Sequence, residues 1–110
     1  MSAFVADVDR VTDDIVRVID ATPSTAGIDQ AQEILDAKRA DLKSRYHRLS
    51  DLPRYELSND LLKEFTEGIS RNMEAVANLQ IKHGDKSFAN QTFGKKMNKL
   101  YRDYSSIFGV

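Results

Sequence analysis

The 110-residue chain has no cysteine and is poor in proline and glycine, with two and five residues respectively. Without cysteine it can form no disulfide, no thiolate nucleophile and no cysteine-ligated metal site. The scarcity of proline and glycine argues against a turn-rich all-β fold. Purely apolar runs extend over only a few residues, so no segment is expected to cross a membrane. These absences favour a helical globular domain.

An excess of charge of one sign is also missing. Lysine and arginine number 16, and aspartate and glutamate 17, for a net charge of −1. This balance argues against a globally basic nucleic-acid-binding protein but permits a local basic patch. Hydrophobic residues make up 41% of the chain and charged residues 30%, which is typical of a folded rather than a disordered sequence. At this length we expect one domain over residues 1–110.

The first residues do not have the pattern of a secretory signal, in which basic residues precede a long apolar run. Here the first basic residue is Arg10, and Asp7 and Asp9 interrupt the apolar residues. The missing signal pattern favours the cytoplasm slightly as the compartment. Export after removal of a leader is the alternative.

Apolar residues recur at steps of three and four in four blocks of the sequence, which predicts four amphipathic helices. Ser58 is predicted to cap the third helix and Gly84 to end it. Asp85 or Ser87 is predicted to cap the fourth helix, and Gly109 to close it. The predicted helices cover roughly residues 3–20, 24–50, 58–83 and 87–108.

The connections between these helices are short, roughly 3–7 residues, so consecutive helices should run antiparallel. We therefore expect an all-α fold, an antiparallel up-down-up-down four-helix bundle, in which the first and last helices are neighbours. The first helix and the residue after it carry a net charge of −3, and residues 82–103 carry +4. Opposite charges would favour this pairing over other arrangements, although each exposed ion pair is worth only about 0–1 kcal/mol.

The sequence has no recognisable catalytic or metal-binding motif. Neither His47 nor His83 has an acidic residue three or four positions before it, which excludes the Glu-x-x-His pattern of di-iron bundles. There is no Gly-x-Ser-x-Gly nucleophile elbow and no glycine-rich phosphate loop. We therefore expect a non-enzymatic protein with no catalytic residue, no metal and no cofactor.

Four residues leave open a carrier of haem or of a small apolar ligand between the helices. Met73 and Met97 lie on the apolar stripes of the predicted helices. Asn72 lies on or beside such a stripe, and His83 lies at the end of one. Simpler explanations are favoured, because methionines fill gaps in cores, a seam asparagine sets helix register and a histidine can cap a helix end.

Lys95, Lys99 and Arg102 follow steps of four and three and so form one ridge opposite the apolar stripe of the last helix. This basic ridge either contacts phosphates or an acidic partner, or is a solvated face that balances the first helix. Nucleic acid is not favoured, because the cations are few and no aromatic residue is interleaved with them for base stacking.

Three apolar residues lie off the main stripes. Val5 and Val16 either widen the buried face of the first helix or form an exposed strip that docks a partner helix. Tyr55 either plugs the bundle end or, if exposed, marks a protein interface. We predict a protein–protein interaction module whose partner is another protein or a second copy. Anion binding through the basic ridge and ligand carriage are the alternatives.

Overall fold

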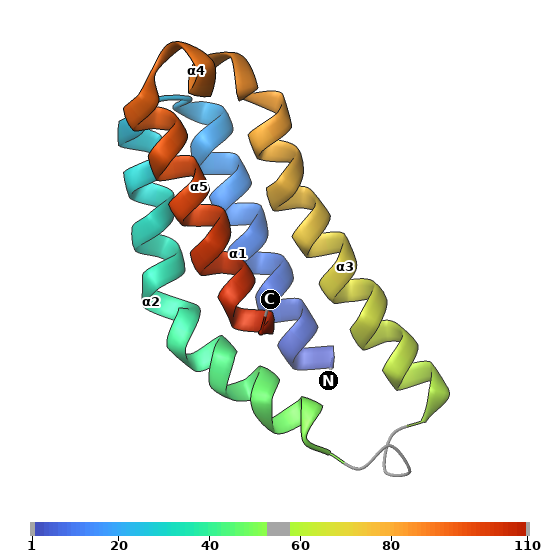
Figure 1. Ribbon diagram of the computed structural model, residues 1–110. Coiled ribbons are helices and arrows are strands. Elements are labelled where there is room, and N and C mark those ends of the chain that lie inside the picture. The colour runs from blue at the N-terminus through green and yellow to red at the C-terminus, as the bar shows by residue number, and fades with distance from the viewer. Residues whose placement is uncertain (1, 53–57, 110) are drawn as a thin grey trace.

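The computed structural model describes residues 2–52 and 58–109 and is all-α, with no strand in those two ranges. The predicted helical class is therefore confirmed. None of the described helices combines the length and the apolar character that a membrane span needs. The elements are α1 (Ser2–Ala21), α2 (Thr25–Ser50), α3 (Asn59–Lys82), α4 (Gly84–Ala89), α5 (Gln91–Ser105) and the 3-10 turn η2 (Ser106–Phe108) (Figure 1).

The molecule is elongated, with extents of 50 × 22 × 21 Å. Chain direction alternates along α1, α2, α3 and α5 (Figure 1). α1 packs against α2 and α3, and α5 packs against the same two helices. Between α1 and α5, no pair of Cα atoms lies within 8 Å, so these two helices occupy a diagonal. The expectation that the first and last helices are neighbours is therefore wrong.

The ion pairs of α1 agree with this arrangement, and packing decides it, because such pairs contribute only about 0–1 kcal/mol each. Asp7 Oδ2 of α1 lies 2.7 Å from Arg45 Nη1 of α2, and Asp9 Oδ1 lies 3.0 Å from Arg71 Nη2 of α3. The cations that neutralise these acids come from the second and third helices, so α1 does not need the lysines of α5 beside it.

The predicted seams form the core. Ile15, Ile19, Leu35, Leu100 and Tyr104 are completely covered, and together they represent α1, α2 and α5. α3 contributes a further set of buried side chains to the same cluster, namely Phe65, Val76 and Leu79. At the end of the molecule opposite α4 an aromatic cluster closes the core, made of Phe4, Tyr46, Phe65 and Phe108.

The last predicted helix is divided in two. Gly84 begins the short helix α4 instead of ending the helical run, and α5 starts only after Asn90. The backbone of Asn90 is extended, and its Oδ1 accepts hydrogen bonds from the N–H groups of Thr92 and Phe93 at 3.0 and 3.3 Å. Neither Asp85 nor Ser87 is therefore the cap, because the asparagine satisfies the free amides of α5.

Two other predicted helix ends are confirmed. The Ser58 hydroxyl accepts a hydrogen bond from the Leu61 N–H at 3.1 Å and caps α3. Gly109 closes the final turn with a φ of 72°, a left-handed conformation that glycine adopts without steric cost.

Candidate functional site

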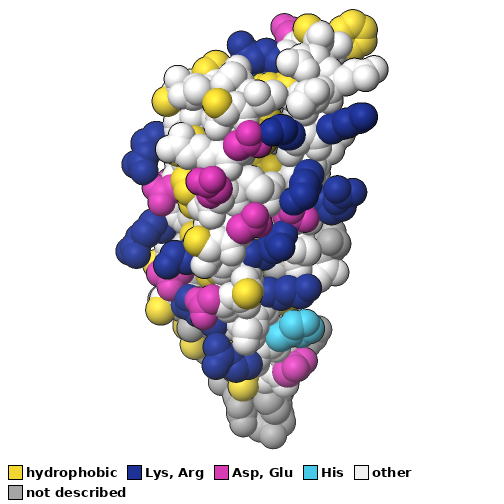
Figure 2. All heavy atoms as spheres, turned by 90° about the vertical axis from the view of Figure 1, so that its left-hand side faces the viewer, with side chains coloured by type: hydrophobic (Ala, Val, Ile, Leu, Met, Phe, Trp, Pro, Cys, Tyr) yellow, Lys and Arg dark blue, Asp and Glu magenta, His cyan; other side chains and the backbone are white. Residues whose placement is uncertain are grey.

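The three residues of the basic ridge lie together on the outer face of α5. Lys95, Lys99 and Arg102 are all exposed, whereas Phe93 and Met97 on the other side of the helix are buried. In Figure 2, where α2 faces the viewer, dark blue lysine and arginine side chains line the right-hand side of the molecule, and others lie on its left-hand side. The helix thus presents its cations to solvent and its apolar stripe to the core.

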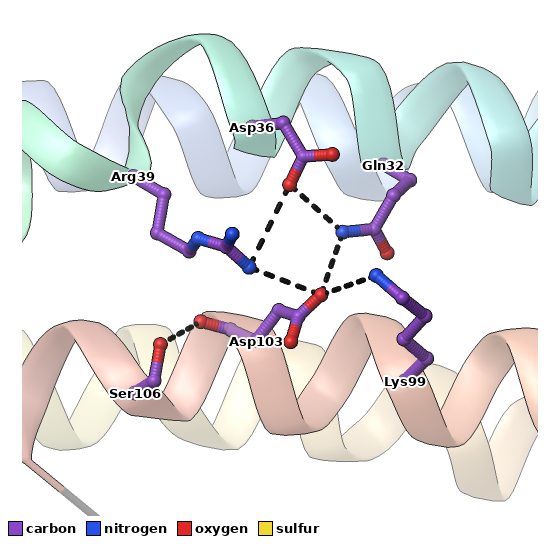
Figure 3. Close-up of polar contacts among 6 residues, drawn as sticks. All are labelled: Gln32, Asp36, Arg39, Lys99, Asp103 and Ser106. Carbon is purple, nitrogen blue, oxygen red and sulfur yellow. Dashed lines mark hydrogen bonds and ion pairs between the residues drawn. The ribbon is translucent and has the colours of Figure 1, made fainter.

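Asp103 ties the ridge to α2 (Figure 3). Its Oδ2 accepts from Lys99 Nζ at 2.7 Å and from Gln32 Nε2 at 3.0 Å, and it pairs with Arg39 Nη1 at 3.0 Å. Gln32 Nε2 also lies 3.0 Å from Asp36 Oδ1, so the amide links two carboxylates. We call this group the Asp103 cluster; it fixes the position of α5 against α2.

The Asp103 carboxylate is only 20% exposed and remains charged. Its burial would raise its pKa, but the hydrogen bond from Lys99 and the positive charges of Lys99 and Arg39 outweigh that effect. The pKa of Asp103 consequently lies below its usual value of 3.8. At neutral pH the aspartate therefore neutralises part of the charge of Lys99.

The rest of the ridge has no such compensation. Within residues 2–52 and 58–109, the side chains of Lys95 and Arg102 make no hydrogen bond and no ion pair. Lys96, beside the ridge, is bound to Asp29 Oδ1 at 2.6 Å and does not add to the free charge. The ridge is therefore a line of three cations on one helix face, and the side chains of two of them are unpaired in the described part of the chain.

The apolar candidates do not form a surface. Val5 is only 7% exposed, because Gly68 of α3 has no side chain and lets the two helices approach closely. A Cβ atom at Gly68 would lie 2.7 Å from Val5 Cγ1. Val16 is half-buried against the core, so both valines widen the buried face and the exposed-strip hypothesis is wrong for Val5. Tyr55 lies outside the described residues.

Two exposed apolar side chains escaped the sequence reasoning. Phe88 of α4 is 94% exposed and Ile81 of α3 is 78% exposed, both near the end of the molecule that carries α4 (Figure 1). Ile81 follows the buried Leu79 by two positions, which turns it away from the core. Each of the two residues lies off the apolar stripe of its predicted helix, and this position in the sequence is the signal that could have identified it as exposed.

The residues considered for a ligand carrier are engaged within the protein. Asn72 Nδ2 donates to Asp9 Oδ1 at 2.6 Å and to the Gly68 carbonyl at 2.8 Å. Met97 is packed in the core, and Met73 packs against it. These contacts fit the simpler explanations, in which Asn72 sets helix register and the methionines fill the core.

His83 lies where α3 meets α4 and is 7% exposed. Its Nε2 is 3.1 Å from Asp20 Oδ1 of α1, and Lys82 Nζ lies at the same distance from that oxygen. Burial would raise the pKa of Asp20, but the hydrogen bonds from His83 and Lys82 outweigh it and lower the pKa below 3.8. The group joins three helix ends. Among residues the structure describes, no three metal-ligating side chains come together.

The chain matches no protein-family model, no curated protein and no solved structure. Its function is therefore argued from its own surface.

Proposed function

We propose that the chain is a non-enzymatic module, a four-helix bundle of alternating chain direction in which α1 and α5 lie on a diagonal, that binds the acidic surface of another protein through the basic ridge. The observation that carries the proposal is the exposure of Lys95 and Arg102 without any partner in the described residues. Unpaired cations on a rigid helix face are free to meet carboxylates of a partner, and complementary charge gives an interface its specificity and its rate of association.

The attachment of α5 to α2 supports this proposal. Asp103 holds Lys99 through a 2.7 Å hydrogen bond and connects α5 to α2 through Arg39 and Gln32. A binding surface on a helix that is fixed to its neighbour loses little conformational freedom when the partner arrives.

A protein partner is favoured over a nucleic acid for two reasons. Three cations on a chain of net charge −1 would release few counterions from a phosphate backbone. Phe93 and Tyr104 of α5 are buried and Tyr101 is half-buried, so this helix presents no fully exposed ring to stack on a base.

Binding of labelled polyglutamate and of a labelled DNA duplex to the full chain, followed by fluorescence anisotropy, tests the proposal. Polyglutamate should bind more tightly than DNA, and its affinity should fall as the salt concentration rises. The double variant Lys95→Glu/Arg102→Glu should weaken polyglutamate binding at least tenfold, about 1.4 kcal/mol. The matched control Arg10→Glu/Lys63→Glu changes the net charge equally on α1 and α3, and should bind like wild type.

Two results would contradict the proposal. Equal losses in the ridge variant and in the control would show that only net charge matters. Tighter binding of DNA than of polyglutamate, abolished by the ridge variant, would replace the protein partner with a nucleic acid. Circular dichroism of each variant establishes that the helices remain folded.

A further inference from the structure

The apolar stripes of α3 and α5 are in phase with each other along the sequence. From Phe65 to Tyr104, alternating steps of four and three residues run through α3, cross α4 and continue through α5 without a change of register. Around the bend the members of this series are Leu79, His83, Lys86, Asn90, Phe93 and Met97. All members of the series are buried or half-buried except Lys86 and Asn90, which are exposed.

A pair of antiparallel helices does not require this agreement, whereas a continuous helix does. In a helix pair each helix turns its own stripe toward the core, and the connection absorbs any difference in phase. A straight helix has no such freedom, because its side chains follow one period from end to end. If α3, α4 and α5 formed one helix, both stripes would lie on the same face.

The backbone between α3 and α5 is already close to a continuous helix. Within residues 59–105 only His83 and Asn90 lie outside a helix, and this range contains no proline. His83 has φ −105° and ψ 21°, near the helical region, and Asn90 is extended with φ −138° and ψ 108°. None of the α4 side chains is buried, so straightening this segment would remove none of them from a core.

We infer that two copies of the chain form a dimer by exchanging α5. In this dimer α3, α4 and α5 form one long helix, and each α5 packs on α2 and α3 of the partner. The contacts of α5 within one chain are remade between chains, such as that of Gln80 Nε2 with Asn98 Oδ1, 3.0 Å apart. Exchange of an identical element therefore costs few contacts. Lys86 and Asn90 would lie at the middle of the long helix, between the two cores.

The exchanged dimer would carry two basic ridges, each fixed in place by the other chain. Asp103 of one chain would pair with Arg39 and Gln32 of its partner, as it does within the single chain at 3.0 Å in both contacts. Two ridges on one particle would strengthen binding to any partner that offers two acidic surfaces. The exchange itself does not depend on what the ridge binds.

Two substitutions should move the equilibrium in opposite directions. Gln91 is the first residue of α5, where proline is well tolerated, and the extended Asn90 has the conformation that precedes a proline. Gln91→Pro therefore keeps the bent chain and prevents the long helix. Asn90→Ala removes the cap that holds Thr92 and Phe93 and places a good helix former at the bend.

Sedimentation of the full chain, refolded at increasing concentration, measures the effect. The wild-type chain should dimerise in a concentration-dependent way, and Asn90→Ala should raise the association constant about tenfold. Gln91→Pro should stay monomeric with unchanged helix content by circular dichroism. Should Gln91→Pro lose its helices, Asn90→Ala and crosslinking still decide the question.

Crosslinking identifies which helix is exchanged. Because the chain has no cysteine, Gln80→Cys and Asn98→Cys each introduce a single thiol. Refolded together, the two variants should be joined by a short bis-maleimide, since α5 of one chain then lies on α3 of the other. Each variant refolded alone, and the same pair carrying Gln91→Pro, should give no crosslinked dimer.

Three results would overturn the exchange. The first is a monomer at every concentration in both the wild-type chain and Asn90→Ala. The second is a dimer that a folded Gln91→Pro variant still forms. The third is a dimer in which Gln80→Cys and Asn98→Cys are not crosslinked, which would show that the chains associate through another face.

Discussion

At the scale of single residues, the core depends on one buried hydrogen bond as well as on apolar packing. The Thr12 and Tyr104 oxygens lie 2.6 Å apart, and both side chains are buried. The bond joins α1 to α5, the two helices that face each other across the diagonal. Burial raises the pKa of Tyr104 to about 12 although the bond to Thr12 opposes the rise. The phenol therefore stays protonated and able to donate.

Tyr104→Phe should lower the free energy of unfolding by about 1–2 kcal/mol, because it leaves the buried Thr12 hydroxyl without its partner. Thr12→Val should cost a similar amount. The double variant should cost clearly less than the sum, since no polar group is then left unsatisfied. Urea denaturation of the four proteins measures the coupling, and strictly additive losses would mean that the hydrogen bond contributes nothing.

At the scale of elements, the turn between α1 and α2 requires a glycine in the first turn of α2. A Cβ atom at Gly27 would overlap the carbonyl oxygen of Thr22, which belongs to the backbone and cannot rotate away. The Ser24 N–H donates to that same carbonyl at 2.8 Å, so the turn holds the oxygen in place. Gly84 at the start of α4 differs, because a Cβ there would meet nothing within 4 Å.

Gly27→Ala should therefore destabilise the protein by about 1–3 kcal/mol, since the turn must shift to relieve the overlap. Gly84→Ala is the matched control. It should be neutral or should stabilise by up to about 1 kcal/mol, because alanine is the better helix former and the site is open. Thermal unfolding of both variants makes the comparison, and equal melting temperatures would refute the steric argument.

At the scale of the whole molecule, acidic side chains of α1 pair with its two neighbours, and the basic ridge of α5 remains partly unpaired. Asp7 binds Arg45 of α2, and Asp20 binds Lys82 at the end of α3. The hydrogen bond from Arg45 lowers the pKa of Asp7, against the opposing effect of its partial burial. With Asp103, these carboxylates link neighbouring helices while they are ionised.

Acid should consequently lower the free energy of unfolding of the protein. The pKa values of Asp7, Asp20 and Asp103 in the folded protein lie below their ordinary value of 3.8. The unfolded chain therefore binds more protons in this range, so the stabilisation is full above about pH 4 and is lost as the pH falls through the folded pKa values. Urea denaturation between pH 6 and about pH 3 measures the loss. Asp103→Asn should reduce the dependence of the free energy of unfolding on pH. A free energy of unfolding that does not change with pH in the wild-type protein would contradict the prediction.

The candidate site could be predicted only in part from the sequence. The spacing of Lys95, Lys99 and Arg102 places them on one helix face, which requires only the helical period. The burial of Val5 depends on the missing side chain of Gly68, which lies on a helix distant in sequence. The Asp103 cluster likewise needs α2 beside α5, an adjacency that no local pattern encodes.

The sequence by itself determined where the three long helices α1, α2 and α3 lie and which stripe of each is apolar, because backbone hydrogen bonding and side-chain period are local properties. It also identified caps such as Ser58, whose partner is three residues away. Only the tertiary structure decided that α1 and α5 stand on a diagonal. Helix adjacency depends on packing between distant segments, and adjacency in turn decides which charges pair and which are left for a partner.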